Sequence, residues 1–113
     1  MSDLTNKFWD LCSEVDEALQ GVGDVQPALR NVLELVVSAP HASNELMLCF
    51  IELLNGRGPW EVAYYCMRRL KWLEVYKAAS EMFVESADFR VKTVMGHIRA
   101  AYDLHQEETD YLY

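Results

Sequence analysis

The sequence lacks the short motifs that mark common catalytic and metal-binding sites. No Gly-Lys-Ser/Thr follows the glycine-containing turn at residues 56–59, which argues against a phosphate-cradling loop. The histidines His41, His97 and His105 contain no i,i+4 pair of the kind that helical metal sites use. His97 and His105 are also rotated about 80° apart on a continuous helix. We therefore expect no enzymatic activity, no cofactor and no metal ion.

Long apolar runs are also missing. The longest, Leu46–Ile51, has 6 residues, whereas a helix needs about 20 to cross a bilayer. Residues 1–20 contain 5 acidic residues and lack the basic start and apolar centre of a secretory signal. These absences predict a cytoplasmic protein that does not bind a membrane.

Cysteines are few, with 3 in 113 residues. Cys12, Cys49 and Cys66 are odd in number and widely spaced, which is untypical of a disulfide framework. Arg69 follows Cys66 closely and would favour a reactive thiolate there. However, each cysteine lies among apolar residues, and free cysteine is one of the most frequently buried residue types. We expect three buried thiols.

What the chain does contain is a helical pattern. Hydrophobic residues make up 51% of the 113 residues and charged residues 25%, as in ordinary globular domains. Apolar residues recur at three- and four-residue steps, and no segment has the alternation of a strand. The pattern predicts a single all-α domain of five or six short helices over residues 1–102, and an acidic, aromatic tail or helix extension at 103–113. The expected helices begin at Ser2 or Asp3, at Asp24, at Ser43 or Asn44, at Pro59 and at Asp88, with a break near residues 70–73 that gives a sixth.

Short connections between these helices favour antiparallel pairs. We expect the helices within residues 24–54 to form one pair and those within 59–86 to form another. Consecutive short helix pairs of this kind over residues 24–102 resemble the right-handed stacking of HEAT and armadillo proteins. An orthogonal bundle is the alternative architecture.

Charge is unevenly distributed along the chain, whose net charge is −8. Residues 1–24 carry 6 acidic residues against Lys7 alone, and residues 103–113 carry 4 with no Lys or Arg. Residues 57–77 reverse this balance, with 5 basic residues against 2 acidic ones. An acidic protein is repelled by nucleic acid and attracted by basic surfaces. The composition therefore favours a protein partner with a basic surface over a nucleic acid, which only the basic residues beside Trp72 would suit.

These features together indicate non-enzymatic protein recognition, such as an immunity or inhibitor protein that neutralises a basic partner. Terminal carboxylates would speed the encounter, and aromatic side chains would hold the complex. The candidate partner-binding residues are Asp10, Glu14, Glu17, Trp60, Tyr64, Arg68, Arg69, Lys71, Glu107, Glu108 and Asp110.

Three other interpretations stay open from the sequence. The basic middle could bind the acidic end of a second copy, giving a homo-oligomeric structural or adaptor protein. Arg68, Arg69 and Lys71 could instead pair within the chain, with the first helix or with the tail. A small enzyme or ligand carrier could use Cys66, Arg68 or His97 in a pocket between helices.

Overall fold

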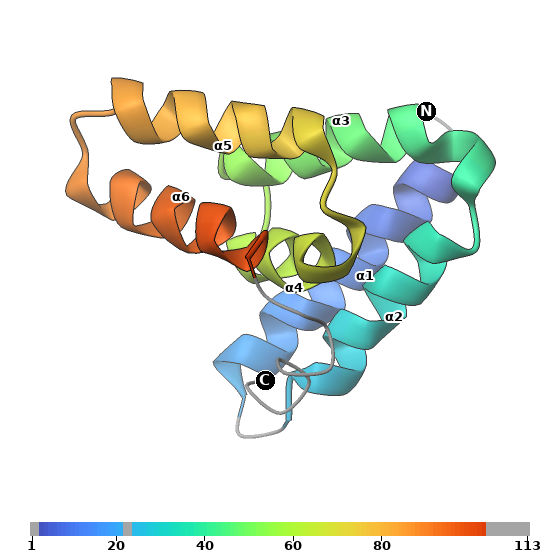
Figure 1. The fold of residues 1–113 in the computed structure, drawn as a ribbon. Helices are drawn as coiled ribbons and strands as arrows, with labels where there is room; N and C mark the ends of the chain where they lie inside the picture. Colours follow the sequence, from blue (N-terminus) through green and yellow to red (C-terminus); the bar gives the residue numbers. More distant parts are fainter. Residues whose placement is uncertain (1–2, 22–23, 104–113) are drawn as a thin grey trace.

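The computed structural model describes residues 3–21 and 24–103. In these residues the chain forms six α-helices and one 3-10 turn, with no strand, which confirms the predicted all-α fold (Figure 1). The predicted tail lies outside the described residues except for Asp103. The elements are α1 (Asp3–Gln20), α2 (Gln26–Val37), η1 (Pro40–Ala42), α3 (Ser43–Leu54), α4 (Trp60–Leu70), α5 (Leu73–Glu85) and α6 (Phe89–Ala101).

The helices stack as three hairpins in two layers. Helix α1 packs on α2, α3 on α4, and α5 on α6. Across the hairpins, α3 contacts both α1 and α5, and α4 contacts both α2 and α6. One layer therefore contains α1, α3 and α5, and the other contains α2, α4 and α6. Figure 1 shows the antiparallel course of the α1–α2 and α5–α6 hairpins at opposite ends of the stack.

Hairpin stacking agrees with the sequence-based expectation, but the predicted pairing was wrong by one helix. The helices within residues 24–54, α2 and α3, do not pair with each other, and neither do α4 and α5 within residues 59–86. The main partner of α2 is α1, and that of α5 is α6. The η1 turn, which begins at Pro40, separates α2 from α3 and starts a new hairpin. Between α4 and α5, Lys71 adopts a left-handed conformation with φ of 50° and redirects the chain. The short loops correctly indicated that helices adjacent in the sequence lie near each other. The conformation of each turn determined which of these helices pack as antiparallel pairs.

The helix boundaries follow from local chemistry. The predicted break near residues 70–73 is confirmed, since α4 ends at Leu70 and α5 begins at Leu73. Asp88 caps α6 as expected: its carboxylate accepts a hydrogen bond of 2.9 Å from the Arg90 amide. The Asp24 carboxylate similarly accepts one of 3.0 Å from the Gln26 amide at the start of α2.

An aromatic chain connects the helices of the first layer. Phe8 of α1 meets Phe50 of α3 edge to face at 5.3 Å between ring centroids. Phe50 in turn meets Trp72, which precedes α5, at 5.7 Å. Such edge-to-face pairs contribute about 0.5–1.5 kcal/mol beyond the burial of the rings. These rings fix the spacing of α1, α3 and α5, and thereby position the surfaces on both sides of the stack.

Helix α4 is the centre of the second layer. Because it contacts α2, α3 and α6, six of its residues are buried: Val62, Ala63, Tyr65, Cys66, Met67 and Arg68. Among the residues described, none of the helices combines the length and apolar character that a bilayer crossing requires.

Candidate functional site

The most distinctive charged surface is an acidic stripe on α1, formed by Asp3, Asp10, Glu14 and Glu17. These residues are spaced at intervals of three, four and seven, which places them on one side of a helix with 3.6 residues per turn. All four are exposed. The opposite side of α1 is buried through Thr5, Phe8, Cys12 and Val15. The amphipathic pattern of α1 therefore directs its carboxylates to solvent.

The acidic stripe is not neutralised by cations elsewhere in the described part of the chain. Between two described residues, the one ion pair joins Arg57 and Glu52 at 3.0 Å. The same guanidinium lies over the Trp9 ring, 4.0 Å from its centroid. No ion pair forms between the acidic stripe and Arg68, Arg69 or Lys71, so that form of intramolecular pairing is not seen. Lys7, which is also exposed, lies on the same side of α1, four residues after Asp3 and three before Asp10, so the four carboxylates of the stripe outnumber one cation there.

The predicted aromatic anchors are partly used within the fold. The Trp60 ring stacks on His97 of α6, with centroids 5.7 Å apart and an angle of 15° between the rings. Tyr64 lies 6.1 Å from Trp60 on the same helix. Both residues are half-buried. As binding residues they would offer only their exposed edges, so the carboxylates of α1 are the more accessible part of the predicted surface.

The three residues of the predicted basic cluster, Arg68, Arg69 and Lys71, do not share one surface. Arg68 is only 1% exposed, and its guanidinium lies 5.1 Å and 4.9 Å from the ring centroids of Tyr64 and Tyr65. Arg69 is exposed, because successive residues of a helix are rotated by about 100°. The Lys71 ammonium donates a hydrogen bond of 2.7 Å to the Tyr102 carbonyl. Burial of Arg68 leaves fewer exposed cations for a homo-oligomer contact than the sequence suggested.

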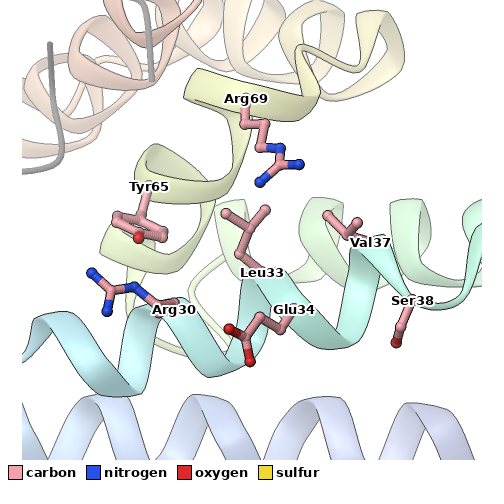
Figure 2. A pocket seen from close by; sticks show the side chains of 7 residues that line it. All are labelled: Arg30, Leu33, Glu34, Val37, Ser38, Tyr65 and Arg69. Carbon is pink, nitrogen blue, oxygen red and sulfur yellow. The ribbon is translucent and has the colours of Figure 1, made fainter. Parts of the chain in front are cut away.

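A groove between α2 and α4 was not predicted. It has a volume of about 300 Å³ and is lined by Arg30, Leu33, Glu34, Val37, Ser38, Tyr65 and Arg69. Figure 2 shows Leu33, Val37 and Arg69 directed into the space between the two helices, while Glu34 and Ser38 line the groove from the part of α2 that is farther from α4. The i, i+3, i+4, i+7 spacing of residues 30, 33, 34 and 37 is the signal that could have placed them on one surface.

The remaining predicted residues, Glu107, Glu108 and Asp110, lie outside the described residues. Among the residues that are described, no group of three His, Cys, Asp or Glu side chains could hold a metal ion. His97 is exposed and stacked on Trp60.

The cysteines are buried and free, as predicted. Burial, with a smaller contribution from Cys49, raises the pKa of Cys12 from 9.0 to about 12. Burial also raises the pKa of Cys66 well above its ordinary value, and the nearby Arg68 opposes this only in part. The pKa of Cys49 is raised mainly by burial, and further by the negative charges of Glu52 and Glu45. The positive charge of Arg57 and a hydrogen bond with Thr5 lower this pKa in part. Protonated thiols in the core are poor nucleophiles.

Replacing Arg68 with alanine should destabilise the protein by about 2–4 kcal/mol, because the substitution leaves a cavity and removes two cation–aromatic contacts. Replacing Lys77, an exposed cation on α5, should change stability by at most about 0.5 kcal/mol. Urea unfolding of Arg68→Ala and Lys77→Ala measures both values. Equal effects of the two substitutions would mean that the Arg68 guanidinium is not held in the core.

Stability should fall as the pH rises above about 9, because the thiols of the unfolded chain then lose protons that the folded protein retains. The raised pKa values of the three cysteines and of Tyr102, whose hydroxyl is partly buried, all act in this direction. Urea unfolding under reducing conditions between about pH 7 and pH 11 measures the decline. Cys12→Ala should show a shallower slope, and a free energy of unfolding that stays constant up to pH 11 would contradict the buried thiols.

Known proteins offer no identification for this chain. No protein-family model matches it, no curated protein is significantly similar to it, and no solved structure matches it. The acidic stripe and the groove are therefore interpreted from their own chemistry.

Proposed function

We propose that this protein is a non-enzymatic recognition protein that binds the basic surface of another protein through the acidic stripe of α1. The observation that carries the proposal is the position of Asp10, Glu14 and Glu17, exposed on the outer side of the helix at one end of the stack. An immunity or inhibitor protein that neutralises a basic partner is the specific role that this surface suits.

The location of the stripe supports binding without rearrangement. Helix α1 is held by α2 and α3 on its buried side, and Phe8, which is fully buried, anchors it to Phe50. The carboxylates therefore project from a rigid support. Preorganised groups lose less conformational entropy on binding than groups on a flexible segment.

Charge explains how such a surface would act. Carboxylates of one sign attract a basic partner before contact and raise the association rate, and dissolved salt weakens this effect. The net charge of −8 adds to the attraction. Exposed edges of Trp60 and Tyr64 would supply a second, aromatic contribution for a partner large enough to reach them. Binding is consequently expected to be fast and sensitive to ionic strength.

The test compares two triple charge reversals with equal changes in net charge. One variant reverses the stripe with Asp10→Lys, Glu14→Lys and Glu17→Lys. The matched control reverses three exposed carboxylates of α5 with Glu74→Lys, Glu81→Lys and Glu85→Lys. A partner captured from the native cell by the immobilised unchanged protein is identified, purified and titrated against all three proteins at low and high salt.

We expect the stripe variant to bind the purified partner at least about tenfold more weakly, a loss of about 1.4 kcal/mol, while the α5 variant stays close to the unchanged protein. The purified partner should carry a basic surface, and its affinity should fall as salt rises. Equal affinities of the three proteins, or the capture of no specific partner, would refute the proposal.

A further inference from the structure

The groove between α2 and α4 combines an apolar floor with cations at its edges. Tyr65 and Leu33 form its buried side, and Val37 is 43% exposed although it is aliphatic. Arg30 and Arg69 are exposed and come from different helices. One carboxylate, that of Glu34, also lines the groove, so the two cations outnumber it. A segment that carries both carboxylates and large apolar side chains would match this surface.

The end of α6 is held at the C-terminal end of α4, the helix that forms one side of the groove. The Lys71 ammonium donates a hydrogen bond of 2.7 Å to the Tyr102 carbonyl, and the Tyr102 hydroxyl donates one of 2.8 Å to the Trp72 carbonyl. Lys71 directly follows the last turn of α4, the turn that carries Arg69. The chain therefore leaves the described part of the structure, after Asp103, near the C-terminal end of α4, two residues beyond Arg69.

Chain length permits residues 104–113 to cover the groove. Ten residues can span up to about 33–36 Å when extended. The groove follows α2 from Arg30 to Ser38, a distance of about 12 Å at 1.5 Å per residue. The remaining length allows for the turn that the chain must make after α6.

The composition of residues 104–113 complements that of the groove. This segment contains Glu107, Glu108 and Asp110 and no Lys or Arg. It also contains Leu104, Tyr111, Leu112 and Tyr113, which can cover the apolar floor. We propose that residues 104–113 dock into the α2–α4 groove of the same chain, with their carboxylates directed to Arg30 and Arg69. Docked in this way, the segment covers the groove and its two cations, and leaves the acidic stripe of α1 open.

Attachment to the same chain favours this occupant over a separate one. A linked segment binds as if it were present at high effective concentration, of the order of millimolar, so a modest affinity is sufficient. The corresponding segment of a second copy has the same chemistry and is the competing occupant. The proposal is independent of the partner proposed above, since it does not involve Asp10, Glu14 or Glu17.

A spin label on the full-length chain tests this docking. Thr109→Cys introduces one reactive thiol, because Cys12, Cys49 and Cys66 are buried. A nitroxide at that position should remove most of the methyl NMR signal of Leu33 and Val37. The methyl groups of Leu48 and Val84, which are exposed on α3 and α5, serve as references and should keep their signal.

Charge variants establish what holds the segment. Arg30→Glu with Arg69→Glu should restore the Leu33 and Val37 signals, whereas Lys77→Glu with Arg90→Glu, the matched control on α5 and α6, should not. Adding Glu107→Lys and Glu108→Lys to the Arg30 and Arg69 variant should bring the broadening back. The proposal would be overturned if the labelled protein kept the full methyl signals of Leu33 and Val37. It would also be overturned if the loss of these signals were the same in all the charge variants.

A mixed sample separates docking within a chain from docking between chains. It contains spin-labelled protein without isotope and isotope-labelled protein without a nitroxide. Docking within the chain predicts no broadening at Leu33 and Val37 in this mixture. Broadening as strong as in the singly prepared sample would assign the groove to a second copy and would overturn the proposal.

Discussion

The arrangement depends on the packing of α4 between three other helices. Contacts with α2, α3 and α6 bury six residues of this helix, and the side chains at those positions must be compatible with burial. Val62, Ala63 and Met67 meet this demand directly. Arg68 meets it by placing its guanidinium over the rings of Tyr64 and Tyr65, where a planar cation is accommodated by the aromatic faces. The groove is bounded on one side by this helix.

Helices at the ends of the stack have fewer neighbours than α4, and α1 is the clearest case. Helix α1 is covered on one side only, and its other side carries four exposed carboxylates that pair with no described residue. The groove lies between α2 and α4, where α4 does not cover all the aliphatic side chains of α2 and leaves Val37 exposed. An acidic outer surface and a groove edged by cations are therefore separate features of one stack. Charge separation along the sequence becomes charge separation in space only in part, since Arg68 is withdrawn into the core.

Features governed by local chemistry could be predicted from the sequence. Helix periodicity predicted five or six helices, and six are formed. The phase shift near residues 70–73 predicted the break before α5, and Asp88 was identified as a cap. The exposure of Asp10, Glu14 and Glu17 followed from the amphipathic pattern of α1. Burial of the cysteines followed from their apolar neighbours.

Features governed by packing between distant segments could not be predicted in this way. The partner of each helix depends on turns such as the left-handed conformation of Lys71, which no residue preference indicates for lysine. Neighbouring arginines in the sequence look equivalent, and only the crowding around α4 separates buried Arg68 from exposed Arg69. Arg30 and Arg69 line one groove although they belong to different hairpins, which periodicity within one helix does not reveal.

The central position of α4 is tested most directly by native-state hydrogen exchange. Amides at the buried centre of a well-packed helix exchange through global unfolding, whereas those of terminal helices exchange through smaller openings. The account predicts that amides at the middle of α4, around Cys66 and Met67, have an opening free energy equal to that of global unfolding, and that amides of α1 and α6 open at lower free energy. Faster exchange in α4 than in α1 and α6 would contradict the account.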